Sequence, residues 1–487
     1  AGEVYGRYFL DNLNVYDKSV STKMNVTIGE GGQDLIGLAG LAGVDLSWLE
    51  SVSITMDSSM KKETIFMGLG AAINGVDILT GNIVYEVDGE AVYLQIPELN
   101  EKFMGMEMPG YALRDMEDIW EMYEAFERVC PDQKEVEQMI NRYMLTVVEC
   151  MDDVAKEKGV LEAADVEQKC TVLTVTADAN TFKDMTMEIL KQMREDEDIE
   201  KIIKAAMEEE IIIEGLYLDD MSPEEAYEEF LDWIDDGLEF MEDYGELEVY
   251  DDEVLEMKVY VDRKGKIVGR TMEMGDVTIH MLMPEDGKQF GYELSYEDSY
   301  FDDPILDETM ALTGSGKRSG DKIDGDFVLE YCDTPMMEIG VQELNLKDMR
   351  IGLLNGSMTL GLTEDAADYM DYTPGAAMIQ GMEISMDWQS DKSSSNCNMG
   401  ISLRDQNLVN MEISYKQEKG YKGANPGKNV VMVDDMDDLM EWGESLDIGG
   451  LTSALKEADV PSEFTDSLEY FEDMDIDSLL RMMYFYY

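Results

Sequence analysis

The side chains that carry most protein chemistry are scarce in this sequence, apart from carboxylates. Its 487 residues include one histidine, His280, and five cysteines. Nucleophilic catalysis through a serine or cysteine, and most histidine-containing metal sites, need at least one placed imidazole. His280 lies between Thr278 and Leu282 on one face of a predicted strand, and the sequence places no nucleophile near it. We therefore expect an ordinary surface or hydrogen-bonded histidine, no catalytic residue, and a protein that is not an enzyme.

The cysteines, at positions 130, 150, 170, 332 and 397, form no C-x-x-C pair and no zinc-binding spacing. Such a pattern favours neither a structural metal site nor a disulfide framework. Cys130 and Cys150 flank a predicted helix whose length of roughly 30 Å keeps their thiols apart. A disulfide between Cys150 and Cys170 is still compatible with the sequence.

Acidic residues dominate the composition. The chain has 108 Asp and Glu against 37 Lys and Arg, and its formal charge is −71. This charge repels the phosphates of nucleic acids and of anionic membrane surfaces. No segment approaches the roughly 18 consecutive apolar residues of a membrane-spanning helix. We predict that the protein binds no nucleic acid and has no membrane span, and that its charge raises the pKa of carboxyl groups.

Two acidic segments have some features of a cation site. Asp434, Asp435, Asp437 and Asp438 cluster where a helix is predicted to begin, and calcium prefers clustered carboxylates. The alternative is an acidic helix start that the helix dipole stabilises. The segment 473–484 has the first ligand spacing of a calcium loop but lacks its glycine and its final glutamate. We expect no tightly bound cofactor, and at most a loosely bound calcium ion at the first cluster.

Methionine is unusually frequent, with 40 residues. Its flexible thioether either fills a core in place of leucine and isoleucine or lines a surface for varied apolar partners. Many of these methionines occupy apolar positions of amphipathic segments, which favours the core-filling role.

Hydrophobic periodicity predicts the elements that position these residues. Half-buried antiparallel strands with one solvent-exposed face are predicted by alternating apolar and polar residues at 20–28 and 51–56 and by a hairpin at 83–96. Apolar residues spaced by three and four predict helices at 131–154 and 189–207, separated by a short strand at 171–177. A third helix begins at Ser222-Pro223-Glu224-Glu225, where a capping serine, a proline and a reciprocal glutamate stand in the preferred order.

Strand alternation returns from about 247 to 416, including an Asn355-Gly356 hairpin, and the tail from about 434 is helical again. This order predicts an α+β fold in which large curved antiparallel sheets pack against amphipathic helices. We expect two lobes of similar plan, an N-terminal lobe of residues 1–245 and a C-terminal lobe of residues 246–487. The tail ends with Tyr484, Phe485, Tyr486 and Tyr487, which we expect to pack in the core or to dock on a partner chain.

Two segments resemble a known group of proteins. Residues 93–99 (YLQIPEL) and 259–270 (VYVDRKGKIVGR) resemble uncharacterised secreted proteins and lipoproteins of anaerobic Gram-positive bacteria, which are distantly similar to the LolA/LppX-like lipoprotein carriers. The resemblance implies an extracellular or cell-surface protein whose large curved sheet wraps over helices and holds a lipid. It implies no catalytic motif.

We therefore predict a non-catalytic extracytoplasmic protein that holds an apolar ligand or a partner segment in a groove between sheet and helices. Burial of apolar surface, at about 25 cal/mol per Å², would supply the binding free energy. The alternative is a structural subunit of a cell-surface or extracellular fibre, a homo-oligomer joined by edge strands or by the aromatic terminus. A third hypothesis is a carboxylate-dependent hydrolase, which needs two carboxyl groups at a fixed separation.

Overall fold

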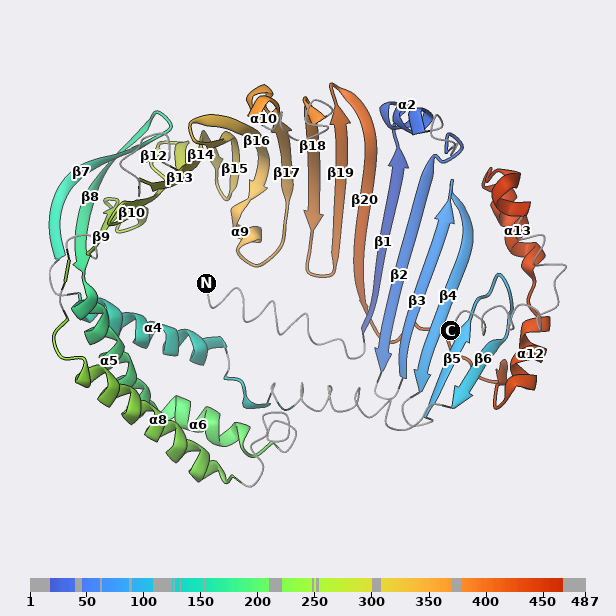
Figure 1. Ribbon diagram of the computed structural model, residues 1–487, viewed down its shortest axis with the longest axis horizontal. Coiled ribbons are helices and arrows are strands. Elements are labelled where there is room, and N and C mark those ends of the chain that lie inside the picture. Colours follow the sequence, from blue (N-terminus) through green and yellow to red (C-terminus); the bar gives the residue numbers. More distant parts are fainter. Residues whose placement is uncertain are drawn as a thin grey trace. The chain divides into compact units, whose positions relative to one another are not determined.

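A computed structural model of the chain (Figure 1) describes residues 18–39, 46–61, 64–86, 90–107, 125, 128–131, 133–151, 154–209, 221–247, 249–250, 254–299, 308–369 and 379–466. Antiparallel strands predominate among these residues, and the helices are grouped between and after runs of strands. This arrangement confirms the predicted α+β class. No helix in the described part of the chain is long and apolar enough to cross a membrane.

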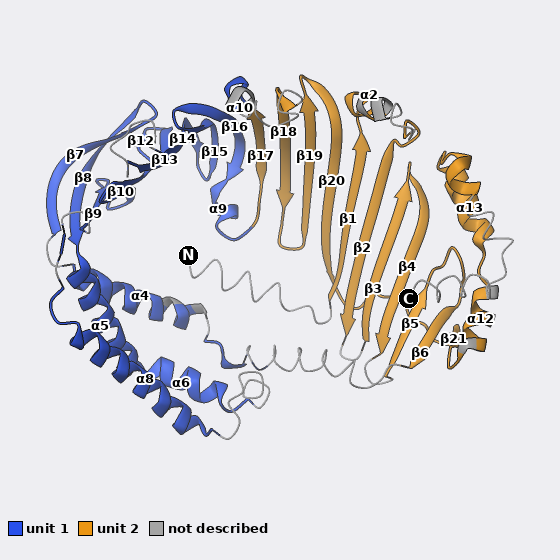
Figure 2. Ribbon diagram, in the orientation of Figure 1, with its two compact units in different colours: residues 1–11, 115–352, 363–370 blue, residues 12–114, 353–362, 371–487 orange. Residues whose placement is uncertain are grey.

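The chain divides into two compact units (Figure 2). Unit 1 comprises residues 1–11, 115–352 and 363–370, and unit 2 comprises residues 12–114, 353–362 and 371–487. This division differs from the boundary predicted near residue 245, because strand pairing joins distant parts of the sequence. Strand β8 (Val166–Ala177) pairs with β9 (Leu255–Val261) in unit 1, and β1 (Lys18–Ile28) pairs with β20 (Gln406–Lys419) in unit 2.

The sheet of unit 2 is built from β1, β20 and nine further strands, which are β2 (Ser51–Lys61), β3 (Thr64–Ile73), β4 (Val76–Glu86), β5 (Ala91–Gln95), β6 (Phe103–Glu107), β17 (Gly356–Leu362), β18 (Met382–Ser390), β19 (Ser394–Leu403) and β21 (Val430–Met432). Their hydrogen-bonded order is β17, β18, β19, β20, β1, β2, β3, β4, β5, β6 and β21. All pairs are antiparallel except β6 with β21. The β4–β5 pairing confirms the hairpin predicted at 83–96.

The hairpin predicted at Asn355-Gly356 is not formed. The short helix α9 (Leu346–Met349) and a turn precede this dipeptide, so no strand lies directly before it. The Asn355 side chain instead accepts a hydrogen bond from the backbone N–H of Ser390 (2.7 Å) and donates one to its carbonyl (3.0 Å). Asn355 therefore ties the start of β17 to the end of β18.

On β2 the alternation separates a polar face from an apolar face as predicted, but the large apolar side chains near the middle of the strand are exposed. On β2, Ser53, Thr55 and Asp57 are half-buried, whereas the intervening Ile54 and Met56 are exposed. On β3, Gly68 and Phe66 are buried on one face, and Met67 and Leu69 on the other face are exposed. Alternation identifies the two faces of a strand, but the segment that packs on a face is not encoded in it.

Two buried clusters anchor the sheet of unit 2. The first joins Phe66, Val84 and Phe103. The second joins Ile78 of β4 to Ala458, directly after α13 (Ile448–Glu457). Helix α13, together with α12 (Met436–Glu444), confirms the helical tail predicted from about residue 434, and α2 (Glu30–Ala39) packs beside β20.

The sheet of unit 1 contains β8, β9 and eight more strands, which are β7 (Val154–Ala163), β10 (Ile267–Met274), β11 (Val277–Leu282), β12 (Glu285–Asp286), β13 (Gln289–Asp298), β14 (Glu308–Ser319), β15 (Lys322–Tyr331) and β16 (Thr334–Asn345). Their order is β7, β8, β9, β10, β11, β13, β14, β15 and β16, and β12 pairs with β13. A short helix, α10 (Glu364–Tyr369), packs near β16.

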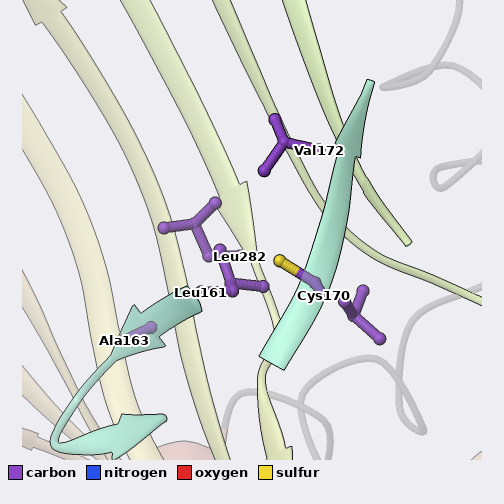
Figure 3. Close-up of a cluster of buried hydrophobic side chains, with 6 residues drawn as sticks. Leu161, Ala163, Cys170, Val172 and Leu282 are labelled. Atoms are coloured by element: carbon purple, nitrogen blue, oxygen red, sulfur yellow. The ribbon is translucent and has the colours of Figure 1, made fainter. Parts of the chain in front are cut away.

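The β7–β8 hairpin packs back onto its own sheet and forms the buried core of unit 1 (Figure 3). Leu161 and Cys170 of the hairpin contact Val268 and Leu282 of β10 and β11. The end of the hairpin also lies against β13, because a Cβ atom placed on Gly291 would be 2.0 Å from the Ala163 carbonyl oxygen. This close approach requires glycine at position 291.

The longer described helices of unit 1 pack mainly on one another, and they are α4 (Gln133–Glu149), α5 (Ala179–Glu195), α6 (Glu197–Ala206) and α8 (Pro223–Asp243). The helix predicted to reach Val154 ends at Glu149, because Val154 begins β7. The helix predicted at 189–207 is two helices divided at Asp196, which has extended backbone angles. The capping box of α8 is confirmed, since Ser222 and Glu225 each accept a hydrogen bond from the other's backbone N–H.

Candidate functional site

An apolar groove runs along α4 in unit 1. Its cavity volume is about 450 Å³, and its lining consists of Pro131, Val136, Met139, Ile140, Tyr143, Met144 and Ile202. Six of these residues precede or belong to α4, and Ile202 is contributed by α6. Val136, Ile140 and Tyr143 belong to the apolar stripe that the sequence predicted, because residues three and four apart share one face of a helix. The sequence predicted a groove between sheet and helices. The groove in the structure lies between helices instead.

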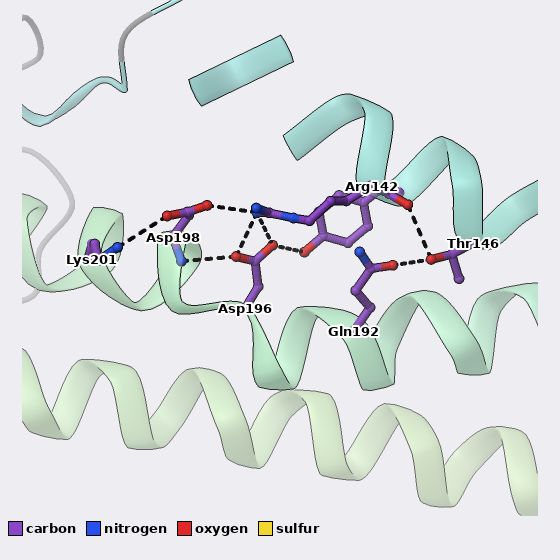
Figure 4. A network of polar contacts seen from close by, with 7 residues as sticks. Arg142, Thr146, Gln192, Asp196, Asp198 and Lys201 are labelled. Carbon is purple, nitrogen blue, oxygen red and sulfur yellow. Dashed lines mark hydrogen bonds and ion pairs between the residues drawn. The ribbon is translucent and has the colours of Figure 1, made fainter. Parts of the chain in front are cut away.

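A buried aspartate holds α4 against the junction of α5 and α6 (Figure 4). One nitrogen of Arg142, Nη2, donates to both carboxylate oxygens of Asp196 (2.9 Å each) and to Asp198 (2.8 Å). The Tyr143 hydroxyl donates to Asp196 as well (2.8 Å). The Asp196 side chain is 4% exposed, whereas that of Arg142 is 41% exposed. Asp196 also caps α6 by accepting a hydrogen bond from the Asp198 N–H. The same side chain therefore starts α6 and binds Arg142 and Tyr143 of α4, the helix that lines the groove.

Contacts in this network shift the pKa values of Arg142, Tyr143 and Asp198. The hydrogen bond to Asp198 raises the pKa of the Arg142 guanidinium, and the same contact lowers the pKa of Asp198. Burial, followed by the hydrogen bond to Asp196, raises the pKa of Tyr143 above its ordinary value. Tyr143 therefore remains a neutral donor at the groove, and its ring lies among the apolar lining. Sequence analysis missed this network because its members come from three helices, and no local motif connects Arg142 with Asp196.

The expected upward shift of carboxyl pKa values is not observed. Among the described aspartates and glutamates with a resolved shift, the pKa is lowered. Asp178 accepts from the Thr181 backbone, Glu225 from the Ser222 backbone, and Asp235 from the Arg194 side chain, and each contact lowers the pKa of the carboxyl group. Local donors outweigh the diffuse negative field because solvent and salt screen distant charges.

Few of the described methionines are fully buried. Among the described residues, Met104, Met185 and Met207 are buried, whereas ten methionines are exposed, namely Met56, Met67, Met106, Met144, Met274, Met281, Met283, Met310, Met349 and Met432. Several lie on apolar sheet faces. Met56 and Met67 belong to unit 2, and Met274, Met281 and Met310 belong to unit 1. The core-filling interpretation is therefore wrong for these ten, and the other methionines with a described side chain are half-buried. Methionine is the most frequent residue type among the exposed large apolar side chains.

His280 has an ordinary hydrogen-bonded environment. Its Nδ1 lies 3.1 Å from the Thr271 hydroxyl, and the Tyr260 hydroxyl is 3.4 Å from the same oxygen. Thr271 is only 2% exposed, so the imidazole and the threonine satisfy each other on the inner side of the unit 1 sheet. The prediction of a satisfied histidine is confirmed.

The acidic residues 434–438 act at the start of α12. The Asp435 carboxylate accepts from the N–H groups of Asp437 (2.9 Å) and Asp438 (3.1 Å), and Asp438 accepts from the Asp434 N–H (3.1 Å). These bonds match the helix-start alternative, and no group of three metal-ligating side chains converges anywhere in the described ranges. A loosely bound calcium ion stays a prediction. Residues 473–484 and the terminal Tyr484, Phe485, Tyr486 and Tyr487 lie outside the described residues.

The five cysteines are present as thiols. The disulfide between Cys150 and Cys170, which the sequence left open, is therefore not formed. Cys170 is buried in the β7–β8 core, and this burial raises the pKa of its thiol. Cys130 and Cys332 are exposed.

Comparison with known proteins adds no assignment. No protein-family model matches this chain, and no curated protein matches it. The resemblance to LolA/LppX-like carriers therefore stays a prediction.

Proposed function

We propose that this protein is a non-catalytic binding protein that holds an apolar ligand in the groove between α4 and α6. The observation that carries the proposal is the lining, in which Tyr143 supplies the only polar atom among seven described side chains. A volume of about 450 Å³ lies within the usual range of small-ligand sites, roughly 300–1,000 Å³. Burial of apolar surface supplies the affinity.

The surroundings of the groove favour a neutral apolar ligand over a charged one. The net charge of −71 disfavours anions near the surface. Arg142, which neighbours Tyr143 on α4, is already engaged by two carboxylates, so it offers no counter-ion to an acidic head group. Met139 and Met144 can adapt to ligands of different shape because their side chains are flexible. An extracellular or cell-surface location fits a carrier of this kind and remains part of the proposal.

The groove predicts a binding result that a neutral fluorescent probe can test. Titration of the full chain with 1-N-phenylnaphthylamine should enhance the fluorescence of the probe with a saturable curve. Ile140→Glu should weaken this binding by about tenfold or more, because a ligand in the groove would bury an uncompensated carboxylate. Mass spectrometry of an organic extract from the purified protein tests independently for a co-purified lipid.

Leu145→Glu is the matched control for this experiment. Leu145 is on the same helix and is 59% exposed, but it does not line the groove. Equal loss of probe binding in the Ile140 and Leu145 variants, or unsaturable enhancement in the wild type, contradicts the proposed function.

A second candidate function is self-assembly through the apolar face of the unit 2 sheet. Leu69 is 53% exposed on this face and Met56 is 51% exposed, and further exposed apolar residues surround them on β2, β3 and β4. Contiguous exposed apolar patches commonly mark protein interfaces. A second copy of the chain can approach this uncharged surface with less repulsion than any acidic surface.

The assembly hypothesis predicts a concentration-dependent mass. Sedimentation velocity at increasing protein concentration should show association, which Leu69→Glu should abolish because it places a charge within the interface. Leu145→Glu, an equal change on unit 1, should leave association unchanged. A monomer at every concentration rejects self-assembly and leaves the ligand-binding proposal intact.

A further inference from the structure

A second hollow, on the polar face of the unit 2 sheet, has a chemistry opposite to that of the groove. It has a volume of about 470 Å³ and lies over β1, β17, β18, β19 and β20, all within unit 2. It shares no residue with the α4–α6 groove, which belongs to unit 1.

The strand register arranges the polar side chains of this hollow in two rows. Direct pairing across β17, β18, β19 and β20 places Ser357, Asp387, Asn398 and Glu412 in one row. The next row on the same face contains Thr359, Ser385, Gly400 and Asn410. The residues between the rows are methionines, whose side chains project from the other face because successive residues alternate. Polar side chains and backbone therefore form the surface of the hollow.

Gly400 leaves the centre of the hollow open. A Cβ atom at this position would lie 2.8 Å from the Ser385 hydroxyl and 3.5 Å from the Asn410 carboxamide oxygen. Any larger side chain would project between Ser385 and Asn410 within the second row. Gly361, on the same face of β17, has no atom within 4 Å of its Cβ position and does not line the hollow.

The lining can both donate and accept hydrogen bonds. It holds three asparagines and four serines or threonines against two carboxylates, and no lysine, arginine or histidine is among these described residues. A polyamine would use acceptors only, and an anion would meet two carboxylates without a cation. A neutral ligand with many hydroxyl groups donates to the carboxylates and exchanges hydrogen bonds in both directions with the amides and hydroxyls.

We propose that this hollow binds a neutral saccharide, which lies across β17 to β20 over Gly400. Asp387 and Glu412 accept hydrogen bonds from sugar hydroxyls, and Asn398, between them in the same row, both donates and accepts. The site is separate from the groove in unit 1, so each site can be tested without the other.

Saturation-transfer NMR on the full chain with maltotriose, cellotriose and tri-N-acetylchitotriose tests the proposal. At least one of these neutral trisaccharides should receive saturation, and calorimetry should then give its affinity. Gly400→Val should lower that affinity by about tenfold or more, because the new side chain occupies the ligand volume. Gly361→Val, the matched change in open space, should leave the affinity unchanged.

Asn398→Ala is the second variant. It tests the saccharide proposal even if Gly400→Val fails to fold, and circular dichroism shows whether each variant is folded. It removes a side chain instead of adding one, and it should weaken trisaccharide binding as well. Absence of saturation transfer to all three trisaccharides overturns the proposal. Undiminished saturation transfer from the Asn398→Ala variant to the trisaccharide also overturns it. Displacement of the sugar by spermidine overturns it as well, because that result shows that the hollow binds cations.

Discussion

Replacing Arg142 with methionine should lower the free energy of unfolding of unit 1 by about 2–3 kcal/mol. The substitution leaves Asp196 buried with only the Tyr143 hydroxyl and the Asp198 N–H as donors. A buried charge that loses its ion-pair partner costs up to about 3–5 kcal/mol, and the two remaining donors, together with the exposure of Arg142, reduce this figure. Urea denaturation followed by far-UV circular dichroism measures the change.

Arg194→Met is the matched control. Arg194 is likewise paired with an aspartate, Asp235, to which it donates through two nitrogens. Both side chains are about half exposed, however, and exposed pairs contribute little to stability. Equal destabilisation by the two variants contradicts the role assigned to Asp196. Because the network orients α4, Arg142→Met should also weaken probe binding in the groove, whereas Arg194→Met should not.

Replacing Gly291 with alanine should destabilise unit 1 by about 3 kcal/mol. The added Cβ would lie 2.0 Å from the Ala163 carbonyl oxygen, so the end of the β7–β8 hairpin must move away from β13. Cys170 reports this movement directly, because it is buried in the cluster that the hairpin closes and its thiol has a raised pKa. Its reaction with a thiol reagent should become faster in the variant.

Gly361→Ala is the control for this prediction, since its Cβ position has no atom within 4 Å. It should be neutral or slightly stabilising, because alanine loses less backbone entropy than glycine on folding. If Gly291→Ala unfolds at the same urea concentration as the wild type and Cys170 reacts at the same rate, the close packing of the hairpin on β13 is disproved.

Local signals explain which elements the sequence could predict. The capping box at Ser222 and Glu225 involves neighbours in the chain, so its residues suffice to identify the start of α8. Strand β7 was missed because its turn to β8 is formed by Ala164 and Asp165, both with positive φ, where glycine or asparagine is usual. The break at Asp196 was missed because residues 195–198 are all acidic, and the sequence does not distinguish the carboxylate that caps α6 from its neighbours.

The candidate site was predictable only in part. The apolar stripe of Val136, Ile140 and Tyr143 follows from helical spacing, and it forms one wall of the groove. The opposite wall, Ile202, and the ion pair between Arg142 and Asp196 join residues more than fifty positions apart. Spacing along the chain contains no information about such contacts. The polar hollow was missed for the same reason, because its rows form across five strands from both ends of the sequence.

The sequence by itself determined the α+β class, the strongly acidic surface, the capping of α8, and the alternation that gives each strand an apolar and a polar face. These properties depend on composition and on neighbours within one turn of helix or a few residues of strand. Only the tertiary structure decided which face is covered, where the two units divide, and that ten described methionines are exposed. Those outcomes depend on which distant segments pair and pack, and burial is a property of the packed surface and not of the residue type.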